Sequence, residues 1–136
     1  MAYQFSKKSL ERLEGVDESL HKLMKRAIAV SPIDFGIPEF GGQRTAEEQH
    51  QLYMRGVSKC DGYELKSRHQ SSCAIDVYAY VDGKASWNKV HLALIAGVVL
   101  AEAQRMNLNV RWGGTFGSKV FRGWDMPHFE LVESEQ

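Results

Sequence analysis

Apolar residues recur at helical spacing in two long stretches of this chain, and these stretches restrict the folds that it can adopt. The first covers residues 7–30 and the second covers residues 90–106. Gly15 interrupts the first stretch, so one or two amphipathic helices are expected there. Pro32 should end it, because the residue before a proline avoids helical geometry. Such helices must cover their apolar faces with another layer of structure.

Short segments rich in strand-forming residues can supply that layer. Residues 74–80 alternate between apolar and polar, and Asp82-Gly83 marks a turn after them. Shorter strands are expected within three further ranges, 35–43, 109–112 and 129–132. Helices and strands alternate irregularly, and no internal repeat is visible. The sequence therefore predicts an α+β domain in which helices pack on a small, mainly antiparallel sheet.

A capping box predicts one more helix in the middle of the chain. Thr45 provides the N-cap hydroxyl and Glu48 is the acid three residues later. The helix should continue to about Arg55, with Gly56 just beyond its end. Residues 57–68 are polar and aperiodic, so a loop is expected there.

Length, charge and hydropathy exclude several classes of function. The chain has 136 residues, the usual size of one domain, so a single domain over 1–136 and a monomer are expected. Lys+Arg and Asp+Glu are both 17, and without a basic run nucleic-acid binding has no support. No apolar run reaches the roughly 18–20 residues that cross a bilayer, and no signal region is visible. Synthesis in the cytoplasm without membrane insertion is expected, with Cys60 and Cys73 reduced.

Two of the five histidines stand out by their surroundings. His69 ends the polar loop, Asp76 lies in the strand that follows, and His128 lies just before the last expected strand. Two imidazoles and one carboxylate suit zinc, with a fourth position open for water as in catalytic sites. Spacing alone does not separate such a site from three unrelated polar residues. The other three histidines lie in expected helices without ligand-like partners and are interpreted as helix-surface residues: His21, His50 and His91.

Three motifs around these residues resemble those of the zinc D-Ala-D-Ala carboxypeptidase family. That family includes vancomycin-resistance dipeptidases and the L-alanyl-D-glutamate peptidases that bacteriophages use as endolysins. The motifs are Gly42-Gln-Arg44-Thr45, Ser67-Arg-His69-Gln-Ser-Ser-Cys-Ala74-Ile-Asp76 and Asp125-Met-Pro-His128. They occur in the family's order and cover most of the chain. The short length, the missing signal and the N-terminal helices look most like the phage endolysin branch.

The resemblance implies a fold, a metal site and an activity. The fold is that of the Hedgehog and D-Ala-D-Ala-peptidase group, with one Zn²⁺ ion held by His69, Asp76 and His128. Asp125 takes the position of the general base, and Arg44 that of the cation that stabilises the anionic intermediate. The implied activity is hydrolysis of peptidoglycan stem peptides at the L-Ala-D-Glu bond, in host-cell lysis. A holin-type partner for export from the host cytoplasm to the cell wall is implied by the resemblance only.

The same residues are compatible with several alternatives. The activity could be that of a D-Ala-D-Ala carboxypeptidase or dipeptidase, or the chain could be a non-catalytic, zinc-stabilised cell-wall-binding module. Glu130 competes with Asp125 for the role of base, because it can alternate onto the face of His128. Ser72 replaces a family glycine, and it must tolerate a positive φ angle if that glycine served one.

Two tryptophans near the motifs invite local hypotheses. Trp124 stands beside Asp125 and could form a wall of the cleft. Trp112 is followed by Gly113 and Gly114, which could let the backbone approach an extended substrate.

Overall fold

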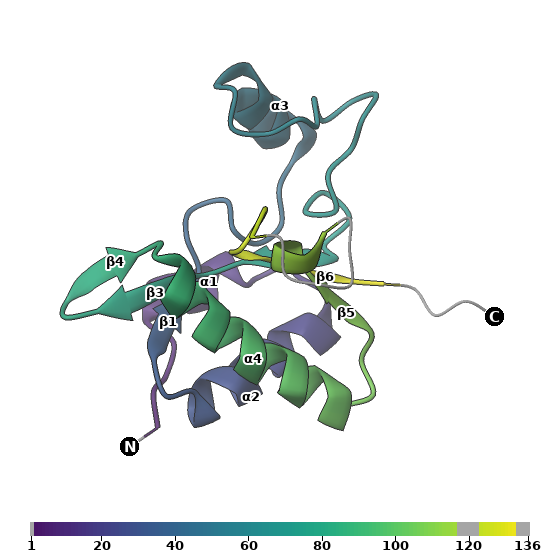
Figure 1. Cartoon of the computed structure of the whole chain (residues 1–136). Coiled ribbons are helices and arrows are strands. Elements are labelled where there is room, and N and C mark those ends of the chain that lie inside the picture. The colour runs from purple at the N-terminus through teal and green to yellow at the C-terminus, as the bar shows by residue number, and fades with distance from the viewer. Residues whose placement is uncertain (1, 117–122, 133–136) are drawn as a thin grey trace.

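The computed structural model describes residues 2–116 and 123–132, which contain four α-helices, six short strands and one 3₁₀ turn (Figure 1). The helices are α1 (Lys7–Arg12), α2 (Glu18–Val30), α3 (Ala46–Met54) and α4 (Lys89–Arg105). The strands are β1 (Asp34–Gly36), β2 (Ala74–Asp76), β3 (Tyr78–Val81), β4 (Lys84–Ser86), β5 (Val110–Trp112) and β6 (His128–Leu131). The 3₁₀ turn η1 covers Gly113–Thr115.

The strands form two three-stranded antiparallel sheets, ordered β1-β3-β4 and β2-β6-β5. The expected α+β class and antiparallel pairing are confirmed, with the strands divided between two sheets rather than one. The expected turn at Asp82 and Gly83 joins β3 to β4, and both residues have positive φ angles of 53° and 78°. This is the conformation that a tight hairpin turn requires.

The strand predicted over residues 74–80 is divided at Val77, and its two halves belong to different sheets. β2 pairs with β6, whereas β3 pairs with β1. Between them, the amide of Val77 donates to the carbonyl of Pro127 over 3.0 Å. Both halves have one buried face, so the alternation continues across the break and does not reveal it. As a result, Asp76 lies at the end of β2, where the two sheets meet.

The strand expected within residues 35–43 is only three residues long. β1 ends at Gly36, and the chain then turns through Phe40, which has a positive φ angle of 62°. The chain direction beyond β1 is therefore set by turns, and this irregular segment passes beside the functional site described below.

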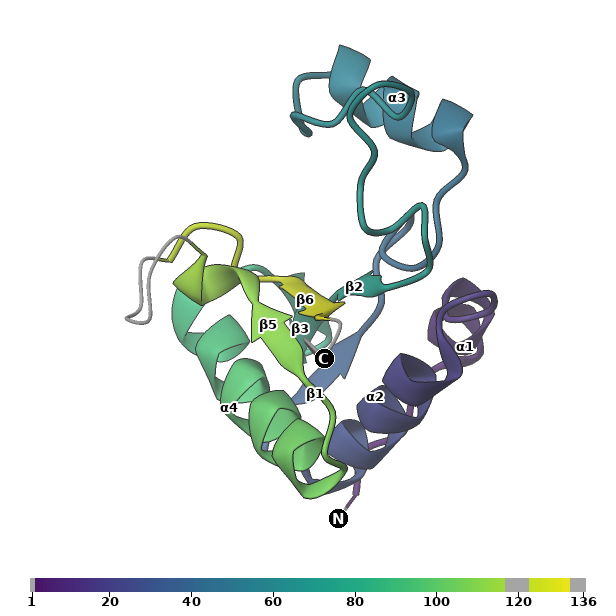
Figure 2. The same cartoon turned by 90° about the vertical axis from the view of Figure 1, so that its right-hand side faces the viewer.

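Helices α2 and α4 pack against each other on one side of the sheets (Figure 2). Their apolar faces and the inward faces of both sheets form one buried cluster, with fully enclosed residues such as Leu20, Ile75, Ile95 and Phe129. The break in the N-terminal helical stretch falls where it was expected, since Gly15 has a φ angle of +83° between α1 and α2. Among the described residues, no helix combines the length and the apolar character that a bilayer crossing requires.

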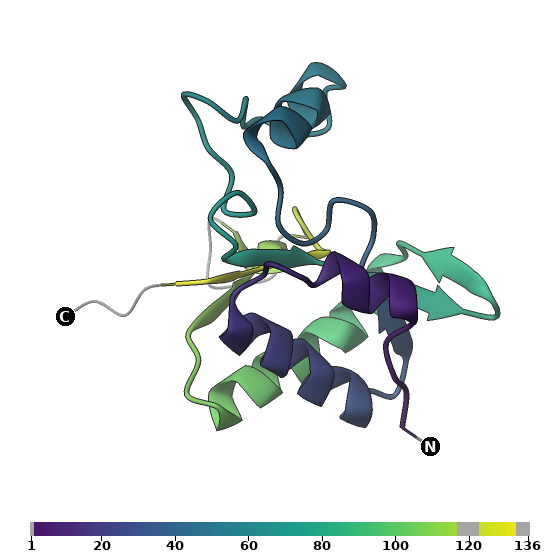
Figure 3. The same ribbon diagram turned by 180° about the vertical axis from the view of Figure 1, so that it is seen from behind.

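Helix α3 and its following loop stand away from this body, on the side opposite α2 and α4 (Figure 3). We call residues 45–66 the α3 lobe. The expected capping box begins the helix, because Thr45 and Glu48 exchange side-chain and backbone hydrogen bonds. The loop lies close to the helix at Gly62, where an added Cβ would come within 2.6 Å of the Ala46 carbonyl. The lobe is thus a small folded unit joined to the body by two segments.

Candidate metal centre and its cleft

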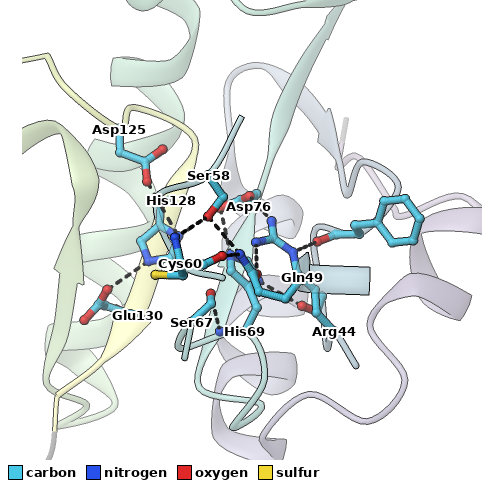
Figure 4. A network of polar contacts seen from close by, with 12 residues as sticks. Arg44, Gln49, Ser58, Cys60, Ser67, His69, Asp76, Asp125, His128 and Glu130 are labelled. Atoms are coloured by element: carbon cyan, nitrogen blue, oxygen red, sulfur yellow. Dashed lines mark hydrogen bonds and ion pairs between the residues drawn. The ribbon is translucent and has the colours of Figure 1, made fainter. Parts of the chain in front are cut away.

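His69, Asp76 and His128 converge on one point beside the α3 lobe (Figure 4). Their ligand atoms all lie within 4.8 Å of one another. Oδ1 of Asp76 is 3.3 Å from Nε2 of His69 and 3.0 Å from Nδ1 of His128. A tetrahedral ion with bonds of about 2.1 Å separates neighbouring ligand atoms by about 3.4 Å. Donor types and spacing therefore fit a metal ion, and within the described part of the chain these three residues form the group that could hold one.

A backbone carbonyl fixes the orientation of the His69 ring. Its Nδ1 lies 2.9 Å from the Gly42 carbonyl, and the side chain is only 2% exposed. A carbonyl accepts hydrogen bonds only, so Nδ1 donates to it, and Nε2 is the nitrogen that faces Asp76 and could bind a metal ion. This is the arrangement in which a second partner fixes the tautomer of a metal-binding histidine.

Residues 40–44 form a cradle for the site through their backbone groups. The Gly41 carbonyl accepts from the amide of Asp76 over 2.8 Å, next to the Gly42 contact with His69. The amide of Arg44 donates in turn to the His69 carbonyl over 3.1 Å. A positive φ angle at a bulky residue such as Phe40 costs about 1–3 kcal/mol and is typical of functional sites. Here it begins the turn that directs these groups toward the ligands.

His128 is the first residue of β6, not a residue before it as the sequence suggested. Strand pairing sets it directly opposite Asp76. Its Nδ1 faces Asp76, and its Nε2 lies 2.9 Å from Oε1 of Glu130. Burial alone would lower the pKa of His128, but hydrogen bonds to Asp76 and Glu130 raise it to about 9. Burial likewise opposes ionisation of Asp76, yet the two histidines hold its pKa well below the usual range.

Asp125 lies at the mouth of the site, with 55% of its side chain exposed. Its Oδ2 is 3.9 Å from Nδ1 of His128. Burial and the negative charge of Asp76 raise the pKa of Asp125, against the pull of the nearby histidines and Arg44. Gly113 supports this position, because an added Cβ would lie 2.0 Å from the Asp125 carbonyl oxygen. In this structure the close approach made by Gly113 is thus to the Asp125 backbone.

Arg44, the residue just before the α3 lobe, reaches the same centre. Its side chain is 12% exposed, and its Nη2 lies 3.2 Å from Oδ2 of Asp76, whereas His128 contacts the other carboxylate oxygen, Oδ1. The other nitrogens are also bonded, Nε to the Phe40 carbonyl at 2.7 Å and Nη1 to Oε1 of Gln49 at 2.9 Å. The capping box places Arg44 just before the helix, so its position follows from the local sequence.

An open cleft joins this centre to the α3 lobe. Besides the residues already described, it is lined by Lys59 and Lys66 of the lobe loop and by Phe116 and Trp124. Trp124 is 74% exposed, in agreement with a cleft wall beside Asp125. The two lysines are exposed and have no acidic partner within the described residues. The lobe side of the cleft is therefore cationic, while the carboxylates gather at the metal centre.

The structure also shows the positions of three residues near the site whose roles the sequence left open or did not indicate. Cys73 is half-buried and its thiol donates to the Ser71 carbonyl, outside the ligand group. Ser72 has a φ angle of +63°, so it does adopt the conformation that favours glycine. Sequence reasoning missed Gln49, which is fully buried beneath Arg44. The only signal was its place on the inner face of the helix after the capping box.

Two imidazoles and a carboxylate that could hold a metal ion lie with a second carboxylate and an arginine in one open cleft, and these groups are those that a metal-assisted hydrolase would use. The family model for phage L-alanyl-D-glutamate peptidase matches residues 1–132. The L-alanyl-D-glutamate peptidase of Escherichia phage T5 is 31% identical over 140 residues, which cover 97% of this chain and 100% of that protein. The crystal structure of the Serratia marcescens L-Ala D-Glu endopeptidase ChiX matches with a TM-score of 0.80 at 32% identity, covering 96% of this chain and 90% of that one. The chain belongs to the phage L-alanyl-D-glutamate peptidase family.

Proposed function

We propose that the protein is a zinc endopeptidase that hydrolyses the L-Ala-D-Glu bond of peptidoglycan stem peptides and acts as a phage endolysin. The observation that carries this proposal is the convergence of His69, Asp76 and His128 beside Asp125 and Arg44 in one cleft. The family relatives supply the bond, since both are named for L-Ala-D-Glu cleavage.

The chain's own residues divide the chemistry between them. A bound zinc ion would lower the pKa of a water molecule and polarise the scissile carbonyl. Asp125 then takes the proton from the attacking water and delivers it to the leaving amine, a role that its raised pKa and exposed carboxylate suit. Arg44 faces the charge that develops on the carbonyl oxygen. A fixed donor of this kind contributes about 3–4 kcal/mol to the transition state.

The charges of the cleft favour an acidic substrate. A D-Glu residue that continues a peptide through one of its carboxyl groups keeps the other as a free carboxylate. Lys59 and Lys66, on the lobe side of the cleft, can accept such a group. The cationic wall supports a substrate whose leaving half carries a free carboxylate. The terminal D-Ala of a D-Ala-D-Ala peptide carries one as well, so the preference for the L-Ala-D-Glu bond rests on the family relatives.

The cellular setting follows from the same proposal. Residues 1–136 act as a single zinc peptidase domain and as a monomer. The enzyme is made in the host cytoplasm and reaches the cell wall after release, with a holin-type partner opening the route.

Digestion of purified peptidoglycan tests the reaction. Mass spectrometry of the soluble fragments should find peptides with a new N-terminal D-Glu. Release of free D-Ala or D-Ala-D-Ala instead would assign the enzyme to the carboxypeptidase or dipeptidase alternative. Intact peptides after incubation with the zinc-loaded protein would support the non-catalytic alternative.

A further inference from the structure

Gln49 is the buried residue of helix α3, and it is polar. Its side chain has no exposed surface, although the other residues of the helix are exposed or half-exposed. Burial of an amide is unfavourable unless its hydrogen-bonding groups find partners. Gln49 is buried although α3 stands away from the hydrophobic core, so the hydrogen-bond partners of its amide should explain its position.

The amide of Gln49 connects two parts of the cleft (Figure 4). Its Oε1 accepts from Nη1 of Arg44 over 2.9 Å. Its Nε2 donates to Oγ of Ser58 over 2.8 Å and to the Cys60 carbonyl over 2.9 Å. Both N–H groups are thus used toward the lobe loop. Because a guanidinium can only donate, the oxygen must face Arg44, which fixes the orientation of the amide.

Loss of this contact would free one side of Arg44. Phe40 and Asp76 hold the other two nitrogens of the guanidinium, and Gln49 completes the set. An arginine side chain has several rotatable bonds, so the planar group keeps one orientation only while its partners are in place. Misplacement of a catalytic group by about 1 Å can reduce a rate about 100-fold.

We propose that Gln49 is a positioning residue, which sets the guanidinium of Arg44 in the cleft and ties it to residues 58–60 of the α3 lobe. The inference rests on the role that the proposed function gives to Arg44. It extends that function, because it makes the lobe loop part of the catalytic apparatus rather than a cover for it. The lobe can then affect the rate of the reaction without contributing a group that touches the scissile bond.

A double-mutant cycle on the zinc-loaded protein tests the proposal. Gln49→Met keeps a side chain of similar length and removes all three hydrogen bonds. We expect kcat for an L-Ala-D-Glu peptide to fall about 10-fold to 100-fold, with KM and zinc content close to wild type. In an Arg44→Ala background the same substitution should have no further effect on kcat. A full, multiplicative loss in that background would overturn the proposal, because Gln49 would then act independently of Arg44.

Two further variants keep the test decisive. Gln51→Met changes an exposed glutamine of the same helix and should leave kcat unchanged. Ser58→Ala removes one lobe contact while the bond between Arg44 and Gln49 remains, so it should give a smaller loss that also vanishes with Arg44→Ala. If the Gln49→Met protein does not fold, the double-mutant cycle is measured with Ser58→Ala and Arg44→Ala instead. An unchanged kcat of the Ser58→Ala protein would then contradict the proposal.

Nuclear magnetic resonance supplies a readout without turnover. The Nε–H signal of Arg44 should exchange faster with water in the Gln49→Met protein than in the wild type, because the guanidinium has lost one fixed partner. Equal exchange rates would count against a positioning role. An inactive wild-type enzyme in the same assay would instead refute the proposed function, so the two failures are distinguishable.

Discussion

Glu130 accepts a hydrogen bond from Nε2 of His128 over 2.9 Å, while Nδ1 of the same ring faces Asp76. The two carboxylates thus occupy the two nitrogens of one imidazole. A carboxylate in the position of Glu130 fixes the tautomer of the histidine and directs its other nitrogen toward a metal ion. The hydrogen bond from His128 holds the pKa of Glu130 below its usual range, with burial acting against it. Asp125, with its raised pKa and exposed oxygen atoms, is the better candidate for the base.

Substitution of the two acids should separate these roles. Asp125→Asn removes the proton acceptor, so kcat should fall about 10²-fold to 10⁴-fold while zinc content and fold stay unchanged. Glu130→Gln keeps an acceptor for Nε2 of His128 and should reduce metal affinity more than kcat at saturating zinc. Kinetics at saturating zinc, together with metal titration of both variants, measure the two effects. Wild-type turnover by the Asp125→Asn protein would assign the base elsewhere.

Removal of the metal should abolish activity, and the pH dependence of zinc binding should identify His128. A chelator should inactivate the enzyme and added zinc should restore it, with about one ion per chain by elemental analysis. Zinc needs the lone pair of Nδ1 of His128, so zinc affinity should fall by up to about tenfold per pH unit below 9. Activity that survives complete removal of zinc would refute the metal mechanism.

The stability of the metal-free protein should change with pH in the opposite direction. The pKa of His128 is raised by folding, so the proton stabilises the folded state most below the unfolded value of 6.5. This contribution should be lost as the pH rises from there through about 9. Urea unfolding of metal-free wild type and of His128→Gln at pH 6 and pH 9 isolates it as the difference between the two proteins. If the free energy of unfolding of both proteins changed equally between pH 6 and pH 9, protonated His128 would not stabilise the fold.

The lysines of the cleft should distinguish a free carboxylate from an amide. For peptides that differ only in the α-carboxylate or α-amide of D-Glu, we expect the acid to have the higher kcat/KM. Exposed ion pairs contribute up to about 1 kcal/mol, so the preference should be about fivefold and should decline with added salt. Lys66→Ala should reduce this preference. Lys84→Ala on the β3–β4 hairpin, outside the cleft, is the matched control. An equal effect of both substitutions would show that Lys66 does not recognise the substrate carboxylate.

Ser72 provides a test of stability next to the ligands. It adopts a φ angle of +63° where glycine carries no steric penalty. Ser72→Gly should therefore stabilise the fold by up to about 1 kcal/mol, because relief of the strain exceeds the added entropy of the unfolded chain. Chemical denaturation measures the change. Ser71→Gly alters the exposed neighbour and should instead be neutral or destabilising.

The sequence predicted the local features of this protein well and the long-range ones less well. The capping box at Thr45 and the turn at Asp82 depend on a few consecutive residues, and both were located correctly. The division at Val77 was missed, because both sheets bury alternate residues and the change of partner leaves the pattern intact. The ligands were proposed from motifs, not from spacing. Gln49 carried no motif, since its partners are fixed only when the lobe loop closes over α3.

The position of β6 in its sheet has a consequence for how the enzyme becomes active. β6 lies between β2 and β5, so neither of those strands has its partner until β6 has been synthesised and has docked. The same event brings His128 to Asp76 across 52 positions of sequence. Contacts of such separation form late, after the cost of closing a long loop has been met. A nascent or truncated chain that lacks β6 therefore contains His69 and Asp76 but lacks His128, the third member of the group that could hold a metal ion. The three residues of this group therefore come together only when β6 docks, in a late step of folding.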